Sequence, residues 1–503
     1  MGRLQRRRGG RVRPPAAQAA VRPAPARGDA VRRLAAGTLL VGLAACAPLP
    51  ADLPARPALS TPSADATLAN LAAPLPHTAA DARPAPWWRA FGAPELDRLI
   101  DTALRDQPDL AAAQARLAAA GQAERLAALD AGAHYATDVS LSRQRLSENG
   151  LYPPPIGGST YTETQISQGV AYNLDWWGRN RALLRAAGNE RRAAGSELAA
   201  ARLSVAAAVA DTYFGLADVD TRLRLARDLE ACHVRERDLL QARHDLGLDA
   251  ALPLIDARRK LDYDADLVHR LDYLGHAWRY RLSALLGSDP DHAGALPIPH
   301  ANPAPPALPA SLPVAWLARR PDVAALRSRV EAAAEQSTAA KAEFYPNLDL
   351  RLMVGLDTLE LGKLLRAGSL TAAAGPALHL PIFNTATLRA RLGLREADYA
   401  GAVAAYNHAV QEAARQGADA YALIASLERR AAAQDQAMQE AVRTRTLVGQ
   451  RRDAGLAGPL DALEADAAVL GERLNDSEIQ AARLRARVAL YQALGGDLED
   501  ATP

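Results

Sequence analysis

The sequence contains the same series of motifs twice. The smallest offset between the two series is 206 residues, from Leu174 to Leu380, and the largest is 213, from Gln107 to Arg320. The paired motifs are LDWWG and LPIFN, QPDL and RPDV, DTY at 211–213 and DAY at 419–421, and ALLG at 284–287 and QALG at 492–495. Self-similarity at one spacing indicates a single structural unit used twice, rather than several unrelated domains.

Proline-rich stretches separate the parts of the chain. The first copy is expected over residues 88–295 and the second over 314–497, joined by a Pro-rich linker over 296–313. Residues 46–87 form a Pro/Ala-rich tether, and 498–503 form a short C-terminal tail. Such compositions are typical of extended connections and do not form a packed core.

Each copy predicts unusually long helices, because long stretches of the sequence lack Pro and Gly. A first helix is followed by two extended segments, a very long helix, a Gly-containing turn and a returning helix. The helices are expected over 95–130, 179–245 and 250–287 in the first copy, and over 314–343, 385–453 and 459–495 in the second. At 1.5 Å per residue the longest reach ~100 Å. This length favours coiled-coil-like packing or a tube over a compact enzyme core.

The extended segments alternate between apolar and polar residues. Leucine or valine occupies every second position from Leu348 to Leu356, with Asp, Arg, Met and Gly between them. Residues 164–174 show the same pattern, and residues 139–142 show it more weakly. Strict alternation is typical of a strand with one face in lipid and the other lining water. A soluble sheet with one buried face is the alternative interpretation.

Two strands per copy give four per chain, which are too few to close a membrane barrel, since about eight is the minimum. Open strand edges cannot remain in lipid, so a membrane barrel would have to be shared between chains. Two chains would supply eight strands and three would supply twelve, and only the larger barrel leaves an open lumen. The expected fold class is therefore mainly α-helical with membrane β-strands.

The N-terminus has the features of a bacterial lipoprotein signal. Arg32 and Arg33 precede an apolar run from Leu34 to Ala45, which is too short for the ~20 residues that span a bilayer. The run ends in Leu-Ala-Ala-Cys, which resembles a lipobox. Residues 1–45 are then the signal, and Cys46 becomes the lipidated first residue; an ordinary signal with a chance cysteine is the alternative.

Charge and motif content exclude several function classes. Removing residues 1–45 takes away ten Arg and one Asp, which leaves 49 basic and 56 acidic residues and a net charge of −7. A mildly acidic chain gives no electrostatic case for nucleic-acid binding. The sequence also lacks zinc-ligand spacing, a nucleophile elbow and a phosphate-binding Gly loop, so we expect neither an enzyme nor a cofactor beyond the lipid on Cys46.

Four segments in combination resemble the outer-membrane efflux channel family, the TolC-like proteins, and within it the NodT-type lipoprotein branch. They are LDWWGRNRA at 174–182, AEFYPN at 342–347, LPIFN at 380–384, and ADY at 397–399 with AYN at 405–407. The resemblance covers nearly all of residues 85–497. One departure is NTAT at 384–387, where relatives usually have an Asp-Gly-Gly-Arg-like turn.

The resemblance implies a homotrimer in the outer membrane. Each chain would give four strands to a twelve-stranded transmembrane barrel and its helices to a periplasmic α-barrel. That tunnel would dock onto a periplasmic adaptor, itself attached to an inner-membrane pump of the major-facilitator or resistance-nodulation-division type. The chain would then be a passive exit duct for drugs or other small toxic molecules. The alternative is a structural outer-membrane lipoprotein that has long helical hairpins but no pore.

Two turns between long helices are candidate functional sites. One contains Gly247 and Leu248, and the other contains Gly455 and Leu456. A glycine at the end of a long helix predicts a left-handed C-cap. The resemblance implies in addition that these turns are the tunnel tips on which the adaptor packs.

Two acidic residues after the second turn are candidates for a gate. Asp461 and Glu464 are three residues apart and so lie on one face of the returning helix. Acids in a first turn also complement the helix dipole, which is the simpler role. The resemblance implies that acids here line the periplasmic mouth as threefold rings, and Arg451 and Arg452 are candidates to hold the mouth shut.

Overall fold

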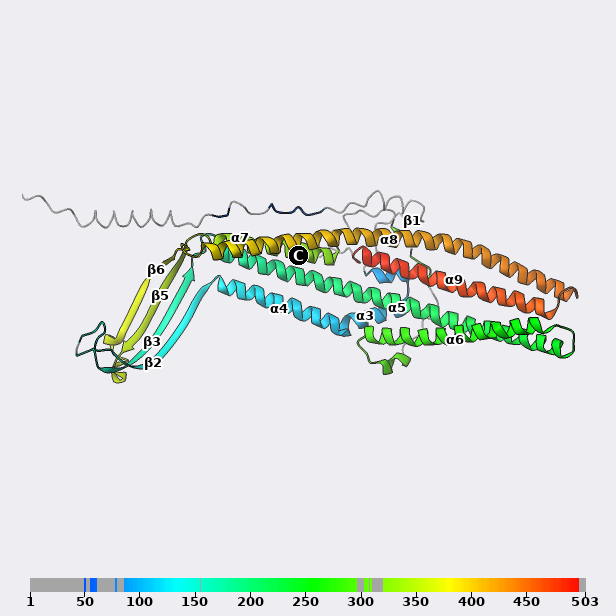
Figure 1. The fold of residues 1–503 in the computed structure, drawn as a ribbon, viewed down its shortest axis with the longest axis horizontal. Helices are drawn as coiled ribbons and strands as arrows, with labels where there is room; N and C mark the ends of the chain where they lie inside the picture. The colour runs from blue at the N-terminus through cyan, green and yellow to red at the C-terminus, as the bar shows by residue number, and fades with distance from the viewer. Residues whose placement is uncertain are drawn as a thin grey trace, which may run out of the picture.

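The computed structural model describes residues 49–50, 55–60, 77–78, 86–153, 155–295, 303–306, 308–309 and 320–496. The molecule is elongated, with a sheet at one end and long helices extending away from it to two hairpin turns at the other (Figure 1). The first copy contains η1 (Trp87–Phe91), α3 (Pro94–Asp106), α4 (Pro108–Asp130), β2 (Ala133–Arg145), β3 (Thr160–Asn173), α5 (Arg179–Asp245), α6 (Ala251–Leu285) and η2 (Pro290–Ala295). The second contains α7 (Pro321–Ala342), β5 (Asn347–Thr358), η4 (Leu361–Lys363), η5 (Ala367–Ser369), β6 (Leu370–His379), α8 (Thr385–Asp453) and α9 (Pro459–Ala493).

The long helices agree closely with the sequence analysis, but the first helix does not. The expected single helix over 95–130 is two helices, α3 and α4, separated at Gln107. Pro108 is the first residue of α4, where its missing N–H costs nothing, and its ring prevents α3 from continuing. In the second copy, α7 begins at Pro321 for the same reason, and residues 314–319 of the helix expected there lie outside the described residues.

The four long strands form one antiparallel sheet in the order β2-β3-β5-β6. The β3–β5 pair joins the two copies, with Ile166 opposite Leu356 and Val170 opposite Leu352. Residues directly opposite one another lie on the same face, so the apolar positions of neighbouring strands coincide. β2 and β6 are the outer strands, and each has one unpaired edge within the described part of the chain.

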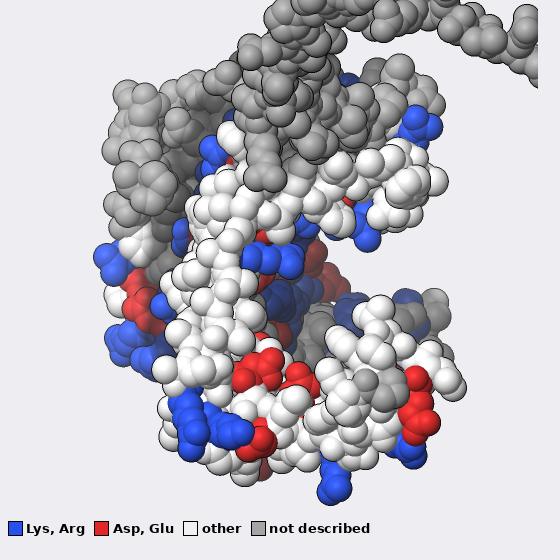
Figure 2. All heavy atoms as spheres, turned by 90° about the vertical axis from the view of Figure 1, so that its left-hand side faces the viewer, with Lys and Arg blue, Asp and Glu red and all other residues white. Residues whose placement is uncertain are grey.

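The helices form a single curved wall. Near the sheet, α5 lies between α4 and α7, and α7 also contacts α8; toward the hairpin turns, α5 lies between α6 and α9, and α9 contacts α8. The free edges of the wall are therefore α4 with α6 on one side and α8 on the other. Viewed from the sheet end, the molecule curves around a hollow that opens to one side (Figure 2).

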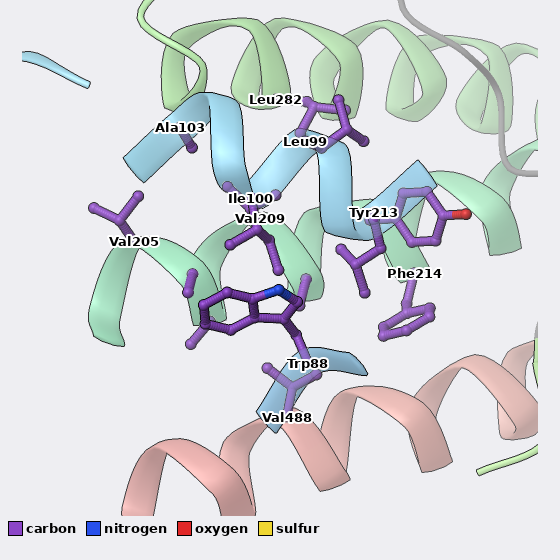
Figure 3. Packing of buried hydrophobic residues seen from close by; sticks show 14 of the residues in the cluster. Trp88, Leu99, Ile100, Ala103, Val205, Val209, Tyr213, Phe214, Leu282 and Val488 are labelled. Carbon is purple, nitrogen blue, oxygen red and sulfur yellow. The ribbon is translucent and has the colours of Figure 1, made fainter. Parts of the chain in front are cut away.

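A cluster of buried apolar side chains connects the two copies near the middle of the wall. Ile100 of α3 lies over Val209 of α5, Leu99 lies beside Leu282 of α6, and Trp88 lies beneath α3 against Val488 of α9 (Figure 3). Trp87 stacks on Tyr491 of α9, with ring centroids 5.4 Å apart. Because η1 and α3 come from the first copy and α9 from the second, this core fixes one copy against the other.

One described helix, α5, is long and apolar enough by composition to cross a membrane. A single helix of this kind is weak evidence for a helical span. The midsection of α5 contributes Ala206, Val209 and Phe214 to the central core.

One short pair of parallel strands joins the two connecting segments. β1 (His77–Thr78), from the expected tether, pairs with β4 (Leu308–Pro309), from the expected inter-repeat linker. The linker is also attached to the wall, because the side chain of Arg487 donates a hydrogen bond to the carbonyl of Pro306 (2.8 Å).

Candidate functional site

One face of the sheet is apolar and exposed. The β2–β3 register places Val139 beside Ile166, and the β5–β6 register places Leu352 beside Ala374. Several large apolar side chains on this face are exposed, for example Tyr135 (80%), Val139 (70%) and Leu352 (55%), whereas Ile166 and Val170 are partly covered. An exposed apolar surface of this extent indicates contact with lipid or with another apolar surface.

The opposite face of the sheet is polar. Near the helical end of the sheet, the amide of Asn173 donates to Asn347 (2.6 Å) and to Asp349 (2.8 Å). Farther along, Asp138, Ser167 and Gly355 lie side by side on this face, in the register of β2, β3 and β5. The alternation predicted from sequence therefore gives a sheet with one apolar and one polar face, as a water-lined membrane barrel requires.

A strained turn connects the sheet to the helical wall. Asp175 adopts φ 39°, in the left-handed region, and is the one described non-glycine residue with positive φ. Its carboxylate accepts hydrogen bonds from the backbone N–H groups of Asn180 (2.9 Å) and Arg181 (3.0 Å), which caps the start of α5. Trp177 stacks on Tyr345 with ring centroids 4.5 Å apart and donates to the carbonyl of Pro346 (2.9 Å). These contacts bring the LDWWG and AEFYPN segments together at the junction of sheet and wall, which the sequence alone does not predict.

The two hairpin turns have the same backbone geometry. At the end of α5, the N–H of Gly247 donates to the backbone carbonyl of His244 (2.8 Å). The N–H of Leu248 donates to the backbone carbonyl of Arg243 (2.8 Å). At the end of α8, Gly455 donates to Arg452 (2.9 Å) and Leu456 to Arg451 (2.7 Å). Both pairs of bonds form a Schellman motif, which requires φ > 0 at the glycine, and the two glycines have φ of 71° and 72°.

The turns present exposed leucines at the end of the molecule. Leu248 is 67% exposed and Leu456 is 70% exposed, and Leu246 beside the first turn is also exposed. The structure therefore places the four predicted tip residues, Gly247, Leu248, Gly455 and Leu456, at the two points farthest from the sheet (Figure 1). Solvent-exposed leucines on a rigid turn are suited to packing against a partner helix.

The two turns differ in charge pairing. In the first, Arg243 binds both carboxylate oxygens of Asp249 (2.6 and 2.9 Å), and these hydrogen bonds lower the pKa of Asp249 below its ordinary value. In the second, Ala457 takes the place of the acid, and Arg451 donates instead to the carbonyl of Leu456 over 3.4 Å.

The predicted gate residues lie close together but form no ion pair with one another in the described part of a single chain. Asp461 is exposed in the first turn of α9 and accepts a hydrogen bond from the N–H of Gly458 (2.7 Å). Through this contact Asp461 caps the start of α9, which is the simpler of the two roles predicted for it. Glu464 is exposed one turn later, and Arg452 approaches Asp453 at 3.9 Å.

The structure describes one of the two cysteines of the chain. Cys46 lies outside the described residues, so its lipidation stays a prediction. Cys232 is buried in α5, where its sulfur contacts the carbonyl of Leu463 of α9 (3.4 Å). It therefore contributes to packing between the two hairpins.

A family model described as outer membrane efflux protein matches residues 99–288 and 312–496, which is most of both copies. The chain belongs to the outer membrane efflux protein family. This efflux protein is 31% identical over 436 residues to the fusaric acid resistance protein FusA of Burkholderia cepacia, covering 83% of this chain and 80% of FusA. It is 29% identical over 473 residues to the multidrug resistance outer membrane protein MdtQ of Escherichia coli O157:H7, covering 91% and 96% of the two chains.

The fold agrees with a solved structure of the same kind. The outer membrane protein VceC of Vibrio cholerae matches with a TM-score of 0.75 and 30% identity, over 83% of this efflux protein and all of VceC. The predicted family, the predicted efflux function, the outer-membrane location and the mainly helical fold with an internal repeat are confirmed. The roles assigned to the tips, the gate and Cys46 stay predictions.

Proposed function

We propose that three copies of this efflux protein close into one continuous duct, with a twelve-stranded barrel in the outer membrane and an α-helical tunnel in the periplasm. The observation that carries this proposal is the four-stranded sheet, which has an exposed apolar face and, among the described residues, no partner for the outer edges of β2 and β6. Unpaired edges are not stable in lipid, so β2 of one copy pairs with β6 of the next. Three copies are favoured over two because eight strands leave little lumen.

The helical wall supports the same arrangement. The wall has α4 and α6 at one free edge and α8 at the other. Since α4 leads into the outer strand β2, and the outer strand β6 leads into α8, the free edges of wall and sheet correspond. One rotation would therefore join sheet to sheet and wall to wall. The hollow on the concave side of one chain would become part of a common lumen (Figure 2).

In this assembly the protein conducts passively and catalyses no reaction. A periplasmic adaptor docks on the tips at Gly247, Leu248, Gly455 and Leu456, and an inner-membrane pump supplies the energy. Rings of Asp461 and Glu464 form the periplasmic gate, with Arg451 and Arg452 as closing partners. The names of FusA and MdtQ, which refer to fusaric acid and multidrug resistance, support small toxic organic molecules as the cargo.

Planar bilayer recording tests conduction. The purified full-length protein should give discrete current steps under applied voltage, with neither pump nor nucleotide present. A structural lipoprotein without a pore, the other function considered, would have no use for a sheet with one apolar and one polar face. That alternative predicts an unchanged bilayer resistance, and such a result would overturn the proposal.

We further propose that Cys46 carries the lipid. Each buried CH₂ group of an acyl chain contributes ~0.8 kcal/mol to membrane attachment. Mass spectrometry of the mature N-terminal peptide should show an acylated Cys46, and an unmodified Cys46 would contradict the proposal. Because the barrel holds the protein in the membrane by itself, Cys46→Ala behind an ordinary cleavable signal should retain conduction.

A further inference from the structure

A short segment close to the expected lipid site is bound to the helical wall. Residues 55–60 run alongside α7 and α8 (Figure 1). The guanidinium of Arg56 donates to the hydroxyl of Ser337 on α7 (2.9 Å) and to both carboxylate oxygens of Glu396 on α8 (3.3 Å each). The side chain of Arg56 therefore bridges two helices, and its partners on both are more than 280 positions away from it in the sequence.

The groups that receive Arg56 form a built polar site. Glu396 is 4% exposed and Ser337 is fully buried. Ser337 donates to Glu396 (2.7 Å), Lys341 contacts the same carboxylate (2.8 Å), and the guanidinium of Arg56 lies over the ring of Tyr399, 4.6 Å from its centroid. A buried carboxylate is costly unless it is paired, and Arg56 supplies the second of its two cations.

A second contact holds the backbone of the segment. The side-chain amide of Asn407 donates to the carbonyl of Ala58 (3.1 Å) and accepts from the N–H of Ser60 (2.7 Å). This paired contact recognises the extended backbone and not a particular side chain. Glu396 and Asn407 are eleven residues apart on α8, or ~17 Å along the helix axis, close to the ~13 Å that four extended residues from Arg56 to Ser60 span.

The local sequence prepares the segment for binding. Pro57 fixes its own φ near −65°, and it disfavours the helical region for Arg56 before it. The unbound segment is thus already biased toward the extended form that Asn407 and Glu396 accept. Less conformational entropy is then lost when it docks.

We propose that residues 55–60 are a strap that binds the α7–α8 pair of its own chain and fixes where the lipid anchor leaves the wall. Arg56 follows Cys46 by ten positions, which span at most ~36 Å. Glu396 lies eleven residues into α8, ~17 Å from the sheet end of that helix. A docked strap therefore allows an acyl chain on Cys46 to reach the membrane that holds the sheet. The binding of the strap does not depend on the oligomeric state or on conduction.

A disulfide between strap and wall tests this. Ser60→Cys with Asn407→Cys, expressed as the full chain in the outer membrane, should link under mild oxidation and migrate as a single chain in a denaturing gel. Ser60→Cys with Gly401→Cys is the matched control, because residue 401 lies on a different face of α8 and should not link. Native Cys232 is buried and should not interfere. Because Asn407→Cys removes the amide contact, the contacts of Arg56 alone hold the strap in this chain. Absence of the link would overturn docking through Arg56, and linked dimers would overturn binding to the same chain.

Two further variants examine the contacts that carry the strap. Arg56→Ala, added to the chain with Ser60→Cys and Asn407→Cys, should lower the initial rate of linking roughly tenfold, since hydrogen bonds to a charged partner are lost. The same two cysteine substitutions in the Cys46→Ala chain should link at an unchanged rate, because the strap binds through its own residues. An unaltered rate in the Arg56→Ala chain, or loss of linking without the lipid, would contradict the proposed recognition.

Discussion

Arg243 and Asp249 close the first hairpin turn with two hydrogen bonds, from Nε to Oδ2 (2.6 Å) and from Nη2 to Oδ1 (2.9 Å). The repeat places Arg451 at the position of Arg243 but Ala457 at that of Asp249. Two turns with the same backbone therefore differ in how their arginine is neutralised. Each tip can therefore serve as the control for experiments on the other.

The first prediction concerns tip rigidity. Arg243→Ala should speed hydrogen exchange of the Gly247 and Leu248 amides, because it removes the ion pair across the turn. Arg451→Ala should have a smaller effect on Gly455 and Leu456, since within the described residues Arg451 makes a single hydrogen bond of 3.4 Å there. Exchange mass spectrometry of both variants measures the difference. Equal acceleration at the two tips would show that the ion pair does not rigidify the first turn.

Replacing the tip glycines should uncouple the channel from its adaptor. Gly247→Val or Gly455→Val forces a β-branched residue to a positive φ, at a cost of about 1–3 kcal/mol. A Cβ at either position would meet nothing within 4 Å in the chain itself, so assembly should survive. Efflux should be lost in a drug-resistance assay. Gly449→Val, in open space within α8, is the control and should keep normal resistance; normal resistance in both tip variants would show that the adaptor docks elsewhere.

The gate residues can be tested without disturbing the helix start. Asp461 caps α9 through the Gly458 N–H, so Asp461→Asn with Glu464→Gln removes the charges and keeps a hydrogen-bond acceptor. This double variant should weaken cation selectivity and block by multivalent cations in planar bilayers. Asp256→Asn, the position in the first copy equivalent to Glu464, should change neither. If the double variant retains wild-type selectivity and block, the two acids are helix caps only.

Glu396 should make stability depend on acid pH. Burial raises the pKa of its carboxyl, but hydrogen bonds from Lys341, Ser337 and Arg56 outweigh burial and hold it at about 2, below the ordinary 4.5. A lowered pKa stabilises the folded state at pH above ~4.5, and this contribution, up to about 3 kcal/mol, is lost as the pH falls toward 2.

The thermal midpoint in detergent, measured from pH 7 down to pH 3, checks this dependence. Glu396→Gln should lower the midpoint at pH 7. The midpoint of this variant should then fall less than that of the wild type between pH 7 and pH 3. Glu360→Gln, an exposed acid in the outer loop region, should behave as wild type. A wild-type pH profile in the Glu396→Gln chain would mean that the carboxylate does not contribute as an ion.

The long helices could be predicted from sequence because their limits are marked locally. α5 ends before Gly247 and α8 before Gly455, and both glycines have the left-handed conformation that ends a helix. The break before Pro108 is also marked in the sequence, although the single helix expected over 95–130 runs through it. A proline at the first position of a helix marks a boundary even between two helical segments.

Other features depend on contacts that a linear pattern does not contain. β6 carries Ala372, Ala373, Ala374, Gly375 and Pro376, which do not alternate, and its register with β5 is what gives it two faces. The strap is similar, because Arg56 lies in a Pro/Ala-rich stretch and its partner Glu396 is 340 residues away. Only the folded chain brings these two charges together.

Native mass spectrometry of the full-length protein, extracted from the outer membrane in mild detergent, tests the central claim most directly. The proposal requires three chains, because twelve strands are needed to pair every edge of the sheets and still leave a lumen. We expect a single species with the mass of three mature chains. A species of one or two chains, folded and stable in detergent, would contradict the shared barrel.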